Sequence, residues 1–179
     1  MDRQQKINTY ERVVQEIEAI LEGETDLLAA MATVVCLLHY AFDTYFWTGF
    51  YRRVGPERLL IGPYQGTLGC LEITFDRGVC GACARSGQTV VVPDVHQFPG
   101  HIACDAASKS EIVVPVRDRA GRLIAVFDVD SDAYNSFDGV DQGYLERIMA
   151  LLGRFDAAPI VYRLPPTQGA SPCLTNPVS

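Results

Sequence analysis

Apolar residues near the start of the chain recur at the spacing of an amphipathic helix. One series runs from Tyr10 to Leu21, and a second runs from Leu27 to Leu38 after a turn at Gly23. Residues three and four positions apart lie on one face of a helix, so each series makes an apolar stripe. The pattern predicts two amphipathic helices at the start of the chain.

Beyond residue 44 the pattern changes to the apolar and β-branched runs that are typical of strands. We expect a hairpin over residues 44–64 with its turn in VGPE, short strands at 71–75 and 89–92, and a second hairpin formed by 111–116 and 123–130. Short and long helices are expected at 79–85 and 138–155, and a loop over 93–109. This order predicts an α+β domain with helices flanking an antiparallel β-sheet.

Length and composition indicate one domain, over residues 1–164. The chain has 179 residues, 48% of them hydrophobic, which suffices for a core without disulfides or a metal. The tail, residues 165–179, is rich in Pro, Ser, Thr and Asn, and we expect it to be disordered.

Charge and hydropathy bear on the expected partners and on the cellular location of the protein. A net charge of −7 without a Lys or Arg cluster argues against nucleic acid. The chain shows neither an apolar run of membrane-spanning length nor a signal peptide, so we expect a cytoplasmic protein. In that reducing compartment, the six cysteines are not a structural framework, and some should be redox-active or metal-binding.

Three carboxylates are placed to meet on the predicted sheet. Asp128 and Asp130 are two residues apart, so they point to one face of a strand, and Glu111 begins the neighbouring strand. In one pocket they would raise one another's pKa and keep a proton available. The alternative is that they are solvated where the strands leave the core.

Two aromatic residues share a strand face. Trp47 and Tyr51 flank Gly49 in WTGFY, and the glycine would leave a gap for a small apolar group between two aromatic walls. The alternative is that both rings belong to the core.

The cysteines differ in their surroundings. Cys104 lies in the 93–109 loop, where Asp94, His96, His101 and Asp105 would either tune its thiolate or act as turn-formers and caps.

Cys80 and Cys83 form a C-x-x-C, either a redox pair or half of a zinc site with His96, His101 or Cys104. The sequence lacks the second C-x-x-C or H-x-x-x-H of a zinc finger. Cys36 lies in an apolar run and Cys173 in the tail, and we set both aside.

Taken in order, WTGFY, LIGPYQG, GCLEI, RGVCG, DVHQFPGHIACDAASKSEIVVP and FDVDS resemble the free methionine-(R)-sulfoxide reductases, which are stand-alone GAF-domain enzymes. The resemblance covers about residues 10–155. It implies a GAF-like fold and the thiol-dependent reduction of free L-methionine (R)-sulfoxide, without a bound cofactor or metal. A sulfenic acid would form on cysteine, then an intramolecular disulfide that thioredoxin reduces.

The resemblance also implies roles for particular residues. Cys104 matches the catalytic cysteine, Cys70 the cysteine that forms a disulfide with it, and Cys80 a third cysteine without an assigned role. Glu111, Asp128 and Asp130 match an acidic pocket, and Trp47 and Tyr51 match the aromatic side of the substrate site. Cys83 departs from the family pattern and leaves an alternative disulfide open.

Two other functions compete with this one: a GAF sensor that binds a small ligand without turnover, and a thiol sensor that reacts with peroxide. The sequence contains no output domain for a sensor. It leaves the oligomeric state open between a monomer and a homodimer.

Overall fold

Two helices, α1 (Arg3–Ile20) and α2 (Leu27–Ala41), form over the two apolar series at the start of the chain. The structure is a computed structural model, and it describes residues 1–100 and 106–155. The predicted domain end at residue 164 and the tail from 165 lie outside these residues. No helix in the described part of the chain is long and apolar enough to cross a membrane.

The remaining elements follow the predicted order. They are β1 (Trp47–Gly55), β2 (Arg58–Gln65), β3 (Glu72–Thr74), α3 (Gly78–Ser86), β4 (Val90–Val92), the short 3-10 helix η1 (Val95–Gln97), β5 (Ser110–Arg117), β6 (Leu123–Ser131) and α4 (Gly139–Leu152). Each predicted helix and strand is confirmed, and the bounds agree to within a few residues except at the start of α1, which begins at Arg3, ahead of the apolar series from Tyr10. The 3-10 helix, within the predicted 93–109 loop, was not expected.

The strands form one antiparallel sheet in the order β3-β2-β1-β6-β5-β4. Both predicted hairpins are present, and β1 of the first pairs with β6 of the second at the centre. In this register Asp130 lies opposite both Trp47 and Glu111, and Asp128 lies opposite Gly49. The sheet therefore brings the predicted acidic and aromatic residues together on one face.

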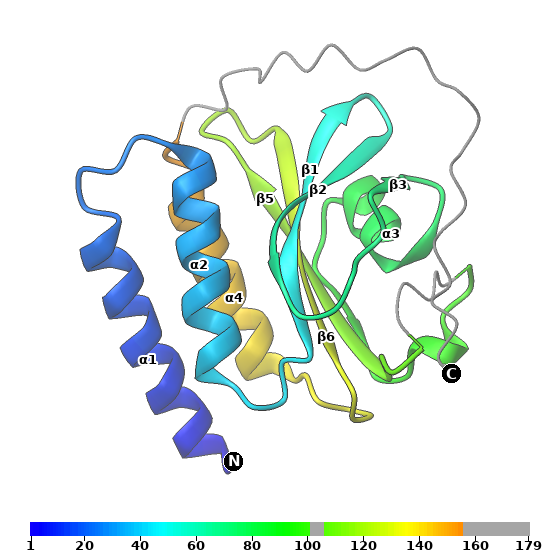
Figure 1. The fold of residues 1–179 in the computed structure, drawn as a ribbon, viewed down its shortest axis with the longest axis horizontal. Helices are drawn as coiled ribbons and strands as arrows, with labels where there is room; N and C mark the ends of the chain where they lie inside the picture. The colour runs from blue at the N-terminus through cyan, green and yellow to red at the C-terminus, as the bar shows by residue number, and fades with distance from the viewer. Residues whose placement is uncertain (101–105, 156–179) are drawn as a thin grey trace.

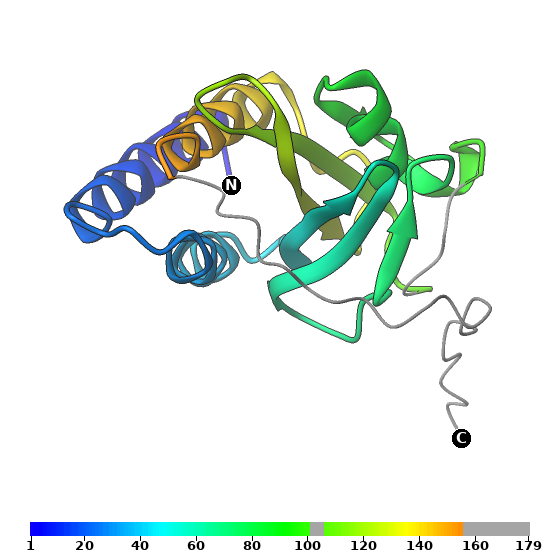
Figure 2. The same ribbon diagram turned by 90° about the horizontal axis from the view of Figure 1, so that it is seen from above.

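The helices divide unequally between the two faces of the sheet (Figures 1 and 2). The helices α1, α2 and α4 lie on one side, and α3 lies on the other. The larger core fills the side of the three helices and includes Phe50, Val114 and Phe127 from the strands. The smaller core, under α3, includes Trp47, Tyr51 and Cys80. The predicted site residues belong to this second side.

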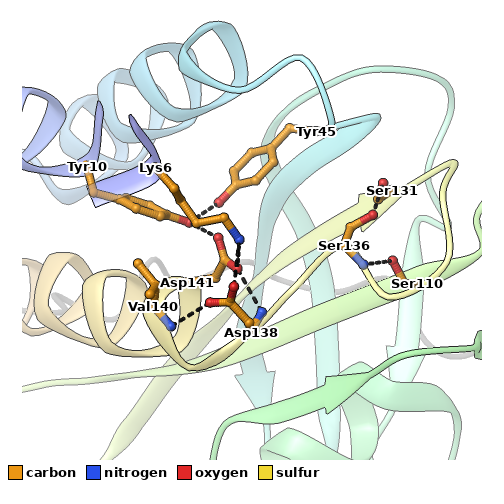
Figure 3. A network of polar contacts seen from close by, with 9 residues as sticks. All are labelled: Lys6, Tyr10, Tyr45, Ser110, Ser131, Ser136, Asp138, Val140 and Asp141. Carbon is orange, nitrogen blue, oxygen red and sulfur yellow. Dashed lines mark hydrogen bonds and ion pairs between the residues drawn. The ribbon is translucent and has the colours of Figure 1, made fainter. Parts of the chain in front are cut away.

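A buried polar network joins the first helix to the last one (Figure 3). Asp141, which is 2% exposed, accepts hydrogen bonds from Lys6 Nζ at 2.6 Å and from Tyr10 Oη at 2.8 Å. Tyr10 Oη is also hydrogen-bonded to Tyr45 Oη at 2.6 Å. Asp141 and Asp138 form a capping box at the start of α4. One carboxylate thus links α1, α4 and the residues before β1.

Replacing Asp141 with alanine should lower the free energy of unfolding by about 3 kcal/mol, because it leaves Lys6 and Tyr10 without their buried acceptor. Urea unfolding followed by circular dichroism measures the change. As a matched control, Arg12→Ala breaks the exposed pair with Glu16 and should cost less than about 0.5 kcal/mol. Equal losses in the two variants would show that the network contributes no more than a surface pair.

Candidate active site

Three buried polar side chains meet between the sheet and α3. Glu111 and Asp128 are each 6% exposed, and Cys80, on α3, is 3% exposed. Cys80 Sγ donates a hydrogen bond to Asp128 Oδ2 at 3.3 Å, and Glu111 is hydrogen-bonded to Asp128. Asp130, the third predicted acid, is partly buried. The alternative that these acids are solvated at strand ends is therefore wrong for Glu111 and Asp128.

Burial raises the affinity of these carboxyl groups for protons. Burial is the largest cause of the raised pKa of Glu111, followed by the charges of Asp128 and Asp130. Burial also raises the pKa of Asp128 to about 7, although hydrogen bonds from Cys80 and Glu111 lower it. The two groups titrate as a pair, in which the proton is held most tightly on Glu111. The predicted effect of neighbouring carboxylates is confirmed for Glu111, whereas the raised pKa of Asp128 comes from burial and not from the other acids.

One oxygen of the pair lacks a partner among the described residues. Asp128 Oδ1 is buried and accepts no hydrogen bond from them, while Oδ2 accepts from Cys80. A buried acceptor without a donor costs free energy, so a donor or a cation that enters the site gains by contacting it. This oxygen is suited to recognise a ligand that brings an N–H or O–H group.

The thiols of α3 are poor nucleophiles in these surroundings. Burial, then the charges of Asp128 and Glu111, raise the pKa of Cys80 well above its ordinary value. Burial likewise raises the pKa of Cys83 to about 12. Both cysteines are free thiols, so no disulfide joins Cys80 to Cys83 in this structure.

The ligand atoms of Cys80, Glu111 and Asp128 lie within 4.8 Å of one another, close enough to hold a divalent cation. This set shares Cys80 with the alternative zinc site, whose His101 and Cys104 lie outside the described residues. Hydrogen bonds already join Cys80 and Glu111 to Asp128, so protons take the place that a cation would take. We therefore interpret the cluster as a proton-holding site.

The aromatic residues are arranged differently from the predicted slot. The Trp47 ring stacks on Tyr51, with ring centroids 5.7 Å apart, and on Tyr64, with centroids 5.4 Å apart. A Cβ on Gly49 would lie 2.5 Å from the Trp47 ring. The indole therefore fills the space that the glycine leaves, and the prediction of an open gap between two walls is wrong. The rings form one continuous aromatic wall instead.

A loop that the sequence analysis did not single out covers this wall. Trp47 Nε1 donates to the carbonyl oxygen of Thr67 at 3.0 Å, and a Cβ on Gly69 would lie 3.1 Å from Tyr51 Oη. The two glycines of QGTLGC could have indicated this loop from the sequence. Gly66 has a positive φ of 115°, and Gly69 lies close to the rings of Trp47 and Tyr51. Tyr64, at the end of β2, was also missed.

Cys70 ends this loop, and it is disulfide-bonded in the structure. Cys36, Cys80 and Cys83 are free thiols. Cys104, together with His101 and Asp105, lies outside the described residues.

In the described part of the 93–109 loop, the capping alternative is confirmed for Asp94. Its side chain accepts from the backbone N–H of His96 at 3.0 Å and begins η1. Asp94 also accepts from Gln97 Nε2 at 2.8 Å. Its carboxylate is therefore engaged in local structure.

Comparison with known proteins identifies close relatives of the chain. A family model described as GAF domain matches residues 22–155. The free methionine-R-sulfoxide reductase of Escherichia coli is 38% identical over 147 residues, 82% of this chain and 88% of that protein. The Saccharomyces cerevisiae protein of the same name is 36% identical over 83% of this chain and 86% of its own length. A solved structure of free methionine-R-sulfoxide reductase from Neisseria meningitidis, in complex with its substrate, has a TM-score of 0.79 and 42% identity, and the match covers 86% of this chain and 89% of that one.

The raised pKa of Asp128 predicts a pH-dependent stability. The stabilisation from this group is present below about pH 4, where unfolded aspartate is also protonated, and is lost as the pH rises through about 7. Asp128→Asn should remove this loss, so its melting temperature should exceed that of the unmodified protein by roughly 2–8 °C at pH 8 and by less at pH 5. Calorimetry at both pH values tests this. Asp132→Asn, an exposed control just after β6, should show no such trend; the same pH dependence in both variants would contradict the assignment.

Proposed function

The chain belongs to the GAF-domain family and to the free methionine-(R)-sulfoxide reductases within it, and we propose that it reduces free L-methionine (R)-sulfoxide through a cysteine sulfenic acid and an intramolecular disulfide. The observation that carries this proposal is the buried, proton-holding pair of Glu111 and Asp128 beside the aromatic wall. Reduction of a sulfoxide needs an acid, because unprotonated oxide is a poor leaving group.

Cys104 is the proposed nucleophile. Its thiolate attacks the sulfur of the sulfoxide while a carboxylic acid of the buried pair protonates the oxygen. In the resulting adduct the protonated oxygen transfers to the sulfur of Cys104: the Cys104 S–O bond forms while the substrate S–O bond and the sulfur–sulfur bond break. Methionine leaves, and Cys104 becomes a sulfenic acid. An acid whose pKa lies near 7, as that of Asp128 does, is matched to this task at neutral pH.

The described chain on either side of Cys104 supports this role. Gly100 O accepts a hydrogen bond from the first residue of α3, Gly78, at 3.0 Å. Lys109 N donates to Ser131 O at 2.8 Å, at the end of β6. The described residues before and after Cys104 are therefore held against α3 and the end of β6.

Cys70 is the proposed resolving thiol. It condenses with the sulfenic acid of Cys104, releases water and forms a disulfide. Two observations support this choice: Cys70 is disulfide-bonded, and Cys36, Cys80 and Cys83 are free thiols. An external dithiol such as thioredoxin then reduces the disulfide by exchange, so the cycle needs no bound cofactor or metal and suits the cytoplasm.

Cys80 is proposed as a positioning residue. Its buried thiol donates to Asp128 Oδ2 and so lowers the pKa of that carboxyl group. The thiol fixes one oxygen and leaves Oδ1 for the substrate. This role accounts for a cysteine in the site that does not take part in the disulfide.

Substrate selection is proposed to combine the carboxylates with the aromatic wall. Glu111, Asp128 and Asp130 line one face of the sheet and would bind the α-ammonium group, while Trp47 and Tyr51 would contact the S-methyl group. A peptide-linked methionine sulfoxide lacks the ammonium group and would leave a buried carboxylate without its partner.

Oxidation of NADPH in the presence of thioredoxin, thioredoxin reductase and free methionine (R)-sulfoxide tests the proposed activity. Turnover should require the free sulfoxide and should exceed that with hydrogen peroxide. A GAF sensor would consume no NADPH, and a peroxide-responsive thiol protein would prefer peroxide. Either result would reject the proposal.

Replacing each of the two proposed cysteines should block a different step of the cycle. Cys104→Ser should release no methionine even in a single turnover, because a serine hydroxyl is not ionised near neutral pH. Cys70→Ser should release about one equivalent and then lose most thioredoxin-linked turnover. Rapid quench with amino-acid analysis measures the first turnover, and mass mapping should find Cys70 joined to Cys104. A dominant link between Cys80 and Cys104 would identify a different resolving thiol.

Removing the charge of each acid should separate catalysis from structure. Glu111→Gln, Asp128→Asn and Asp130→Asn should each lower kcat/KM for free methionine (R)-sulfoxide on the order of 100-fold, as for the loss of a positioned acid. The unmodified enzyme should discriminate against the N-acetylated substrate by a similar factor. Asp132→Asn again serves as the exposed control and should retain full activity. Near-normal rates in the three variants would mean that the acids neither bind nor protonate the substrate.

A further inference from the structure

The loop between β2 and β3, residues 66–71, presents two leucines to solvent beside Cys70. Leu68 is 64% exposed and Leu71 is 73% exposed. In the described residues, the other large apolar side chains that are exposed are Met1, Ile20, Leu28, Tyr40 and Tyr134, all outside this loop. Single exposed apolar residues are ordinary, but two beside a disulfide-bonded cysteine mark a surface that another molecule can cover. We call Leu68 and Leu71 the leucine pair.

Hydrogen bonds on both sides of Cys70 hold this loop in place. Thr67 O accepts from Trp47 Nε1 at 3.0 Å, and Leu71 O accepts from the backbone N–H of Ile61 at 3.0 Å. Gly66 packs against the backbone before β1, where a Cβ would lie 2.7 Å from Phe46 O. The backbone that carries the leucine pair is thus anchored to β1 and β2, which lowers the ordering cost when a partner covers it.

The surface next to the leucine pair is electrically balanced. Glu72, the residue that follows Leu71, forms a two-pronged ion pair with Arg58, with distances of 2.8 Å and 2.6 Å. These two charges offset each other. The leucine pair therefore suits a partner that contributes an uncharged, apolar contact surface rather than a charged one.

We propose that the leucine pair is the docking surface for the protein dithiol that recycles the enzyme, and that this dithiol attacks the sulfur of Cys70. The inference rests on the proposed catalytic cycle, in which the disulfide of Cys70 must be reduced in every turnover. The attacking thiolate forms a mixed disulfide with Cys70 and releases Cys104 as a thiolate. The second thiol of the partner then attacks the mixed disulfide, which frees Cys70 and leaves the partner oxidised.

Docking at this surface can be separated from chemistry by the choice of reductant. The double variant Leu68→Ser/Leu71→Ser should raise the KM for thioredoxin by at least about 10-fold, as for the loss of a contact hot spot. With dithiothreitol, a small dithiol that needs no docking surface, its kcat and its KM for methionine (R)-sulfoxide should stay within about twofold of the unmodified enzyme. As a control, Ile20→Ser removes an exposed apolar side chain from α1, outside the loop, and should leave both assays unchanged.

The outcomes distinguish this inference from the proposed function. An unchanged KM for thioredoxin in the double variant, or equal losses with both reductants, would overturn the docking surface while the catalytic cycle stands. Failure of the unmodified enzyme to turn over with dithiothreitol would overturn the cycle itself and the inference with it.

A second measurement identifies the sulfur that is attacked. Thioredoxin with its second active-site cysteine replaced by serine should trap a mixed disulfide with the oxidised enzyme. Peptide mass mapping should place it on Cys70, and the double variant should trap about 10-fold more slowly. A mixed disulfide found mainly on Cys104 would overturn the proposal.

Discussion

The pairing of β6 with both β1 and β5 is the constraint on which the site depends. It sets Asp130 opposite Trp47 and Glu111, and it sets Asp128 opposite Gly49. Side chains two residues apart share a face, so this single register decides that the acids and the aromatic wall meet under α3. A slip of β6 by one residue would turn Asp128 and Asp130 toward the large core, away from Glu111 and the aromatic wall.

Burying two carboxyl groups opposes folding, and the rest of the molecule has to offset that cost. Desolvation is the largest cause of the raised pKa values of Glu111 and Asp128, and no residue that the structure describes donates a hydrogen bond to Asp128 Oδ1. On the opposite face, three helices cover the large core, and the polar network around Asp141 ties α1 to α4. The face under the three helices thus stabilises the sheet, and the face under α3 holds the buried carboxyl groups, whose burial costs free energy.

The loop of residues 66–71 contacts the buried aromatic wall and also presents side chains to solvent. Its backbone bonds to Trp47 of the aromatic wall, while its last residues carry Cys70 and the exposed leucines. In the proposed cycle the same short segment would resolve the sulfenic acid and receive the reductant. Such concentration of roles is typical of loops that a rigid sheet positions.

The sequence by itself determined the elements and the chemical groups. Apolar spacing sufficed for the helices and strands because local periodicity decides which face of an element is buried, and the two-residue spacing of Asp128 and Asp130 already placed them on one face. Only the tertiary structure decided that Cys80 of α3 meets Asp128, that Trp47 fills the space over Gly49, and that Asp94 caps a helix. The contact between Cys80 and Asp128 joins elements distant in sequence, and the positions of the Trp47 ring and of the Asp94 carboxylate depend on rotamer choice; periodicity carries no information about either.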